Sequence, residues 1–307
     1  MSCSIIIPTY NAENYLPKLL DKLTDQTLPY YELIIIDSSS KDKTVEIAKK
    51  YTNKVIVIPS SEFDHGGTRA MAAEIASGDV LVYFTQDALP YDESCVENIL
   101  QVFKEHNVAA AYGRQLSYPD TNIFGKHLRL FNYPDKTEFR NKENIAKYGI
   151  KTAQLSNSFS AYRRSLLLEQ GNFKDHLILG EDVYIGAKFI LAGYTLAYVG
   201  EAKVYHSHSY SIWEEFKRYF DIGVFHQCER WILDYFGKAD GEGAKYVKSE
   251  LNYILYNKAW YLIPEWFIRN GVKFLGYKLG QNYTKLPLSF VKKLSMHNRW
   301  WNKESHE

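Results

Sequence analysis

Carboxylates that could hold a metal ion or take up a proton occur in two short segments. Asp87 stands alone after an apolar run at residues 80–84. There it could join Mg²⁺ or Mn²⁺ to a diphosphate, because such ions typically take one or two carboxylates. Glu181 and Asp182 open an expected helix, where acidic side chains are favoured. We expect the helix dipole to keep such a carboxylate ionised, as a general base requires. Helix capping alone would explain one of the two acids.

Two histidines could assist a cation at Asp87. Alternate residues of a strand point to the same side, so His206 and His208 share a face if a strand continues through them. A zinc site would need further Cys or His ligands, and the sequence offers no convincing ones. One histidine helping Asp87 to hold a cation is the more economical interpretation.

A pair of glycines lies in the segment at residues 64–69. Gly66 and Gly67 would let the backbone approach a ligand closely before a helix begins. Arg69, one turn into that helix, could donate to a ribose or a diphosphate. Taken alone, a Gly-Gly turn with an exposed arginine explains the segment better.

A further carboxylate, Asp37, ends an apolar run at residues 33–37. At the mouth of a parallel sheet it could accept from the imide N–H of a base or from a ribose hydroxyl. Ser39 and Asp42 resemble a capping box for the next helix, and a plain cap explains them equally well. No Gly-x-Gly-x-x-Gly follows the first apolar run, which disfavours a dinucleotide-dependent dehydrogenase, and the lack of a Walker loop disfavours an ATPase.

Short apolar runs alternate with amphipathic stretches over the first 113 residues. The runs, at residues 4–8, 33–37, 55–58, 80–84 and 108–112, predict strands, and the stretches at residues 15–23, 44–51, 68–77 and 93–106 predict helices. This alternation predicts βαβ units in a parallel sheet with helices on both faces. Ligands of such sheets bind beyond the carboxyl ends of the strands, where polar residues follow four of these runs.

From residue 114 to about residue 155 the alternation is lost, which predicts long functional or mobile loops. A strand is then expected at residues 159–162, a helix at 182–192, and two strands at 195–199 and 203–205. After Ser211 the pattern is helical, over residues 212–235 and 242–262 and then in shorter pieces broken by Pro264 and Pro287.

The composition excludes several classes of protein. The chain has 307 residues, of which 24% are charged, and a formal net charge of +1, which argues against a general nucleic-acid binder. No apolar run is long enough to cross a bilayer, and no signal peptide is expected. Three scattered cysteines are typical of a reducing compartment, so we expect a cytoplasmic protein.

The C-terminal end differs from the rest of the chain. Residues 266–303 contain eight Lys or Arg and no Asp or Glu, and aromatic residues alternate with basic ones over residues 260–301. Helices of this composition lie in membrane interfaces, where each basic residue is attracted to anionic lipid. The alternative is a helical oligomerisation region whose aromatic side chains are buried against a second copy of the chain. The sequence therefore allows a homo-oligomer as well.

In their order and spacing, these segments together resemble glycosyltransferase family 2, the inverting sugar transferases of the GT-A fold. The resemblance covers about residues 3–210, and the segments at residues 63–69 and 85–88 further resemble bacterial rhamnosyltransferases. It implies an α/β protein with a Rossmann-like GT-A catalytic domain at residues 1–210, built on a mainly parallel central sheet. A helical region at residues 211–307 would follow, for membrane contact or oligomerisation.

The resemblance also implies roles for individual residues. Asp182 would be the catalytic base, with Glu181 beside it. Asp37 would contact the pyrimidine base of a nucleotide sugar, and Arg69 its ribose or diphosphate. The full set that would bind the nucleotide sugar is Pro8, Thr9, Tyr10, Asp37, Ser39, His65, Gly66, Arg69, Gln86 and Asp87.

A divalent cation, Mg²⁺ or Mn²⁺, is implied as well. Asp87 matches the last acid of the family's Asp-x-Asp metal motif, but Thr85 stands where the family has its first acid. A second ligand from His206 or His208 therefore becomes more important.

The activity implied is the transfer of L-rhamnose from dTDP-L-rhamnose to a hydroxyl of a lipid-linked cell-wall or O-antigen saccharide. The product would be an α linkage made at the inner face of the cell membrane. Within the class, the alternative is a hexosyl or N-acetylhexosaminyl transferase that uses a UDP-sugar. Outside it, the alternative is a catalytically silent glycan-binding subunit, which the joint presence of Asp37, Asp87 and Asp182 disfavours. A nucleotidyltransferase would need a Gly-rich basic loop that residues 8–11 do not supply.

Overall fold

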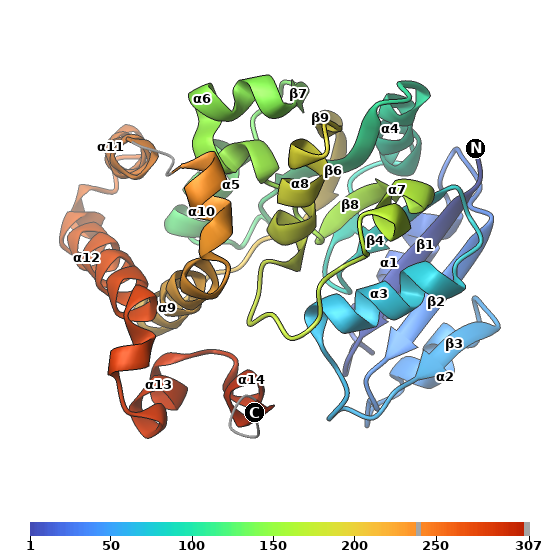
Figure 1. Cartoon of the computed structure of the whole chain (residues 1–307), viewed down its shortest axis with the longest axis horizontal. Coiled ribbons are helices and arrows are strands. Elements are labelled where there is room, and N and C mark those ends of the chain that lie inside the picture. The colour runs from blue at the N-terminus through green and yellow to red at the C-terminus, as the bar shows by residue number, and fades with distance from the viewer. Residues whose placement is uncertain (238–240, 304–307) are drawn as a thin grey trace.

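The computed structural model describes residues 1–237 and 241–303. These residues form one nine-stranded sheet in the order β3-β2-β1-β4-β8-β6-β9-β5, with β7 paired to β9. Helices surround the sheet, and the C-terminal ones gather at one side of it (Figure 1). The strands are β1 (Cys3–Thr9), β2 (Glu32–Asp37), β3 (Lys54–Val57), β4 (Val80–Phe84), β5 (Leu89–Pro90), β6 (Val108–Leu116), β7 (Glu138–Arg140), β8 (Phe159–Arg163) and β9 (Thr195–Tyr205).

The amino-terminal part alternates strands and helices as the sequence predicts. β1 pairs in parallel with β2 and β4, and β2 pairs in parallel with β3. Every residue of β2 and β4 is buried, because apolar clusters cover both faces of the sheet. All five apolar runs of this part are strands, which confirms the α/β fold. The helices up to residue 191 are α1 (Leu16–Thr24), α2 (Thr44–Ala48), α3 (His65–Ile75), α4 (Cys95–Gln101), α5 (Ile123–Asn132), α6 (Ile145–Tyr148), α7 (Arg164–Glu169) and α8 (Glu181–Leu191), with short 3₁₀ turns η1 (Val102–Lys104), η2 (Lys142–Asn144) and η3 (Gly149–Ala153).

The other half of the sheet mixes strand directions. β8 lies antiparallel between β4 and β6, β9 runs parallel to β6, and β5 and β7 pair antiparallel with β9. Phe84, the last residue of β4, faces Phe159, the first residue of β8. The residues that follow β4 and those that precede β8 therefore meet at one edge of the sheet.

Two expectations about the middle of the chain are wrong. Residues 195–205 form one strand, β9, whose pairing with β6 shifts register between Gly113 and Arg114, so an irregularity replaces the expected break. Residues 114–155 hold the helices α5 and α6 and the strand β7 besides loops. Asn122 caps α5 by accepting from the N–H of Gly125 at 2.8 Å, a start signal that the sequence carries.

The C-terminal helices also differ from expectation in their bounds. Glu229 separates α9 from α10, so residues 212–235 are not one helix. Pro264 lies in the first turn of the 19-residue helix α12, where its missing N–H costs nothing, instead of breaking a helix. The elements are α9 (Ile212–Cys228), α10 (Arg230–Phe236), α11 (Glu242–Tyr256), η4 (Trp260–Leu262), α12 (Ile263–Gln281), η5 (Tyr283–Lys285), α13 (Leu288–Leu294) and α14 (Asn298–Lys303).

These helices are packed onto the sheet. Phe216 and Phe220 of α9 belong to the same buried cluster as Ile6 and Tyr83 of the sheet. α12 packs closely against α9. The contact is so close at Gly280 that a Cβ there would collide with the carbonyl oxygen of Phe220. A domain boundary at residue 210 stays a prediction.

The chain then turns back towards the sheet. After α12, which lies at the outer side of the molecule, α13 and α14 return below α9 and α3 (Figure 1). Among the described residues, none of the helices combines the length and the hydrophobicity that crossing a bilayer requires.

Candidate active site

A cavity of about 610 Å³ opens at the carboxyl ends of β1, β2 and β4. Of the residues predicted to bind a nucleotide sugar, the cavity wall contains Pro8, Thr9, Tyr10, His65, Arg69 and Gln86. The other predicted site residues lie outside the lining: Asp37, Ser39, Gly66, Asp87, Glu181, Asp182, His206 and His208.

Asp37 holds two strand ends together below the cavity. Its side chain is fully buried. The hydroxyl of Thr9 donates to it at 2.9 Å, and the N–H and hydroxyl of Ser40 donate at 2.7 and 2.5 Å. Thr9 and Ser38, its neighbours, line the cavity instead. Contact between Asp37 and a pyrimidine base stays a prediction.

Ser39 does not cap a helix, so the capping-box expectation is wrong. The chain turns at Ser39 with a φ of 59°, and its hydroxyl donates to the carbonyl of Ile58 at 2.7 Å. α2 begins only at Thr44, whose N–H donates to Asp42 at 3.0 Å. Ser39 thus fastens the end of β2 to the end of β3.

Gly66 has a role inside the protein. α3 begins at His65, because the carboxylate of Asp64 accepts from the N–H of Gly67 at 2.7 Å. A Cβ on Gly66 would collide with the carbonyl of Lys174. The close approach that this glycine permits is therefore to the loop before α8, and its contact with a nucleotide sugar stays a prediction.

Gln86 braces the loop after β1. Its side-chain oxygen accepts from the N–H of Tyr10 at 2.8 Å, and its side-chain nitrogen donates to the carbonyl of Tyr10 at 3.2 Å. Gln86 thereby joins the β1 and β4 ends, and Tyr10 is left 44% exposed beside the cavity.

Arg69 and Glu181 form a buried ion pair. The guanidinium Nη1 of Arg69 lies 3.2 Å from the carboxylate of Glu181 and donates to the carbonyl of His65 at 2.8 Å. The interpretation of Arg69 as an exposed turn residue is wrong, since only 5% of it is accessible. Its Nε has no hydrogen-bond partner among the described residues and its side chain lines the cavity, so a contact with the ribose or diphosphate stays a prediction.

Asp182 lies next to this pair at the start of α8. Its carboxylate accepts from the N–H of Val183 at 2.8 Å and from that of Asn157 at 3.3 Å. Asn157 also donates from its side chain to Glu181 at 3.0 Å, so it fixes both acids. The side-chain oxygen of Asn157 accepts in turn from Ser160 and Tyr162 of β8.

The two adjacent acids have opposite pKa shifts. Burial, followed by the charge of Glu181, raises the pKa of Asp182 to about 7. Burial also acts on Glu181, but the charges of Arg69 and His65 outweigh it and lower the pKa of Glu181. The expected effect of the helix dipole on Asp182 is therefore corrected. A carboxylate with a pKa near neutrality is well suited to remove a proton at physiological pH.

Asp87, His206 and His208 come together as the sequence predicts. The Nε2 atoms of His206 and His208 lie 3.4 and 3.7 Å from the carboxylate of Asp87, and the three possible ligand atoms lie within 4.8 Å of one another. Burial would raise the pKa of Asp87, but the hydrogen bond and charge of His206 hold it well below its usual range. Burial and His206 lower the pKa of His208 to about 4, so its imidazole is neutral.

This cluster fits a divalent cation. The Nδ1 of His206 lies 2.9 Å from the side-chain oxygen of Gln115, which leaves the lone pair of Nε2 on the side of Asp87. A donor set of one carboxylate and two imidazoles suits Mn²⁺ better than Mg²⁺, which prefers oxygen ligands.

Residues that no sequence motif indicates connect these groups. The side-chain nitrogen of Gln115 donates to Ser156 at 2.8 Å, and Ser156 precedes Asn157. Gln115 thus links the Asp87 cluster to the support of Glu181 and Asp182. Their signal in the sequence is modest: polar residues at the end of β6 and just before β8.

One wall of the cavity is likewise not indicated by any sequence motif. Residues 296–300, from the C-terminal end, line it together with residues of β1 and α3. A sequence pattern that spans local segments does not indicate that this end returns to the sheet.

Comparison with known proteins agrees with this geometry. The family model described as "Glycosyl transferase family 2" matches residues 4–171. The chain belongs to glycosyltransferase family 2. This glycosyltransferase is 46% identical to the O-antigen chain rhamnosyltransferase RfbN of Salmonella typhimurium, over 98% of the chain and 96% of the relative. It is 47% identical to the O-antigen chain rhamnosyltransferase WbaN of Salmonella anatum, with the same coverage.

A solved structure supports the fold of this glycosyltransferase. The mannosyltransferase PcManGT from Pyrobaculum calidifontis, in complex with GDP-Man and Mn²⁺, matches with a TM-score of 0.60 at 16% identity. The match covers 97% of this chain and 87% of the other. The expected GT-A fold is thereby confirmed.

Proposed function

We propose that this glycosyltransferase transfers L-rhamnose from dTDP-β-L-rhamnose, with inversion, to a hydroxyl of a lipid-linked O-antigen-type saccharide. The chain is 46% and 47% identical to two O-antigen chain rhamnosyltransferases over 98% of its length. This similarity supports rhamnose as the transferred sugar and an O-antigen saccharide as the acceptor. The observation that carries the chemistry is the place of Asp182. Its carboxylate accepts from the N–H of Asn157, just before β8, next to the end of β4 that leads to Asp87, and burial with the charge of Glu181 raises its pKa.

In the proposed reaction, the carboxylate of Asp182 removes the proton of the acceptor hydroxyl as its oxygen attacks the anomeric carbon. The bond from that carbon to the diphosphate breaks, and its electron pair leaves with dTDP. Attack on the face opposite the leaving group converts the β donor into an α-rhamnoside. Glu181, ionised beside Arg69, keeps the pKa of Asp182 high enough for it to act as a base at neutral pH.

Asp87, His206 and His208 would hold a divalent cation, as their geometry allows. When bound, the cation would offset the negative charge that grows on the departing diphosphate. The complex of PcManGT with GDP-Man and Mn²⁺ is consistent with this assignment.

Calorimetric titration tests the donor. We expect dTDP-L-rhamnose to bind tightly with Mn²⁺ and weakly without it, and UDP-glucose and UDP-N-acetylglucosamine to bind less well. A preference for a UDP-sugar would contradict the rhamnosyl assignment and favour the hexosyl alternative. Binding of none of the three would favour a silent glycan-binding subunit.

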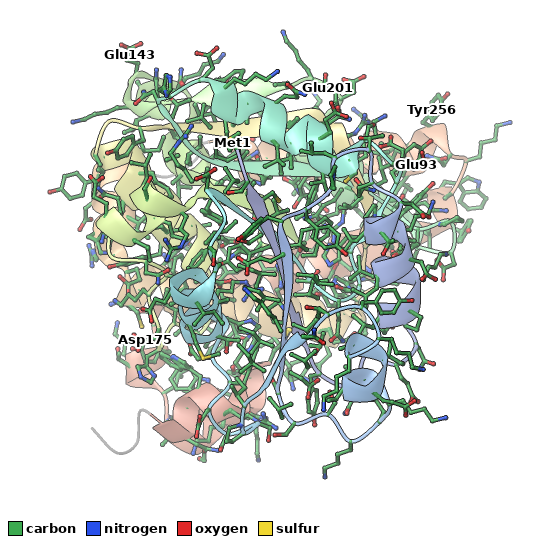
Figure 2. The ribbon with its side chains drawn as sticks, turned by 90° about the vertical axis from the view of Figure 1, so that its right-hand side faces the viewer. Met1, Glu93, Glu143, Asp175, Glu201 and Tyr256 are labelled. Atoms are coloured by element: carbon green, nitrogen blue, oxygen red, sulfur yellow. The ribbon has the colours of Figure 1, made fainter. Side chains whose placement is uncertain are left out.

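The outer side of α12 supports contact with an anionic membrane, where a lipid-linked acceptor would lie. Phe267, Phe274 and Leu275 are 73%, 66% and 51% exposed, and their spacing puts them on one side of the helix. Tyr256, before this helix, is 86% exposed and points away from the body of the protein (Figure 2). Lys278 continues the exposed stripe.

On the inner side of α12, two basic residues do not face lipid, so the expectation that the basic residues of the C-terminal end contact a membrane is partly wrong. Lys273, expected to face lipid, is buried between Glu215 and Glu250, with its amine 3.5 and 3.8 Å from their carboxylates. Arg269 pairs with Glu215 and Glu265 at 3.1 and 2.6 Å. The side chains of Arg269 and Lys273 thus hold α12 against α9 and α11. The exposed aromatic stripe of α12 and the exposed lysines are therefore the groups that could contact lipid.

Vesicle flotation tests this contact. We expect the protein to float with anionic vesicles in a salt-sensitive way, and the double variant Phe267→Asp with Phe274→Asp to stay at the bottom. Tyr31→Asp, at a 67% exposed aromatic residue of the sheet body, is the matched control. A variant that loses self-association but floats normally would show that the stripe binds a second copy.

A further inference from the structure

Residues 296–300 form a strap across the cavity, fastened at both ends. At its start, the N–H of Met296 donates to the buried carboxylate of Asp221 in α9 at 2.8 Å. At its far end, the guanidinium of Arg299 donates to the carbonyl of Ser60 at 3.0 Å, and the indole of Trp300 donates to the carbonyl of His176 at 2.8 Å. The strap therefore joins the loop after β3 to the loop before α8.

Within the strap, His297 packs against another histidine of the cavity, His65. The rings of His297 and His65 lie edge to face, with centroids 5.7 Å apart and planes at 87°, and both residues line the cavity. Within residues 1–237 and 241–303, neither ring nitrogen of His297 has a hydrogen-bond partner. The ring is partly buried and lines the cavity, so a ligand bound there can reach its free donor and acceptor.

The charge state of His297 restricts what it can bind. Burial, followed by the charge of His65, lowers the pKa of His297 to about 4. The neutral ring offers one N–H donor and one acceptor. It matches an uncharged polar group, such as a base carbonyl, an imide N–H or a hydroxyl, better than a phosphate.

The position of the cavity shows which part of a nucleotide sugar would reach His297. Its walls come from β1, from Ser38 after β2 and from residues 63–65 after β3. Residues 85–86 after β4 line its other end, and Asp87, the next residue, lies just outside the lining. If the diphosphate binds at Asp87, as the proposed function holds, the cavity on the β3–β2–β1 side takes the nucleoside.

We infer that His297 is a donor-binding residue that hydrogen-bonds the nucleoside of the nucleotide sugar, and that the C-terminal strap completes the donor site. This inference rests on the proposed function, because it needs the donor to be a nucleotide sugar. It assigns part of donor recognition to a segment more than 200 residues away in sequence from His65.

Calorimetry with dTDP and with dTDP-L-rhamnose, both with Mn²⁺, tests the inference. We expect His297→Ala to weaken both ligands by the same factor, about tenfold, as loss of one hydrogen bond predicts. We expect His297→Gln, which keeps a donor and an acceptor, to restore part of the affinity. His176→Ala is the matched control, because the side chain of His176 is 66% exposed and only its carbonyl holds the strap.

Three outcomes would overturn the inference: unchanged affinity of His297→Ala for dTDP, a loss seen only with dTDP-L-rhamnose, or an equal loss in His176→Ala. Failure of the wild-type protein to bind either ligand would instead count against the proposed function. If His297→Ala does not fold, the imidazole NMR signals of the wild-type protein decide. We expect dTDP to shift the His297 signals, and unshifted signals would overturn the inference.

Discussion

Two aspartates at the same edge of the sheet have opposite electrostatic surroundings. Asp87, after β4, lies beside two histidines that hold its pKa well below the usual range. Asp182, at the start of α8, lies beside another carboxylate, and burial with that neighbour raises its pKa to about 7. Environments that push the pKa values of like groups apart assign them different roles. Asp87 is suited to hold a cation and Asp182 to accept a proton.

The protein keeps these two surroundings separate but connected. Asn157 supports Glu181 and Asp182, whereas Gln115 orients His206. Ser156 joins the two, since it accepts from Gln115 and precedes Asn157. A substitution near Asp87 should therefore affect cation binding first, and one near Asp182 should affect proton transfer first.

The largest effect is expected from Asp182→Asn. The amide cannot accept the acceptor's proton, so we expect turnover to fall about a thousandfold, within the range for general-base catalysis, while donor affinity is kept. Rates of rhamnosyl transfer and calorimetry with dTDP-L-rhamnose measure the two quantities. Asp175→Asn, in the exposed loop before α8, is the control and should leave both unchanged. Near-normal turnover in Asp182→Asn would refute its role as the base.

An intermediate effect is expected from Gln115→Leu, a substitution next to the cluster of Asp87, His206 and His208. Without the Gln115 oxygen, the tautomer and orientation of His206 are no longer fixed. We expect Mn²⁺ affinity in the presence of dTDP to fall about 10- to 100-fold, as for other residues that orient metal ligands. Gln101→Leu, at an exposed position of α4, should bind Mn²⁺ normally. Equal affinities in the two variants would remove Gln115 from the cation site.

The smallest effect is a displacement of the pH profile in Glu181→Gln. In the wild-type protein, kcat/KM should fall as the pH drops below about 7, because Asp182 becomes protonated and loses its capacity as a base. Removing the charge of Glu181 lowers the pKa of Asp182, so the acidic limb should move to lower pH. Glu169→Gln, at an exposed site, should keep the wild-type profile. An unmoved limb in Glu181→Gln would show that Glu181 does not set the pKa of Asp182.

The sequence predicts what local patterns determine. The buried runs of β1, β2 and β4, the helix start at Glu181 and the grouping of Asp87 with His206 and His208 all follow from short segments. The direction of the Asp182 pKa shift was not predictable, because the helix dipole is local whereas burial depends on the whole fold.

The strap and the links between the two aspartates were not predictable either. His297 reaches His65 only because α9 and α12 carry the chain back over the cavity. Gln115 and Asn157 act through contacts between strands far apart in sequence. Ser39 and Gly66 carry plausible local signals, yet long-range packing against Ile58 and Lys174 decides their roles.

Calorimetry of dTDP-L-rhamnose binding to Asp87→Asn and Asp182→Asn, each with and without Mn²⁺, tests the division of roles most directly. We expect Asp182→Asn to bind the donor as the wild-type protein does, with the same gain in affinity from Mn²⁺. We expect Asp87→Asn to lose that gain and to bind the donor equally with and without the cation. A full gain from Mn²⁺ in Asp87→Asn, or its loss in Asp182→Asn, would show that the two aspartates do not divide the roles in this way.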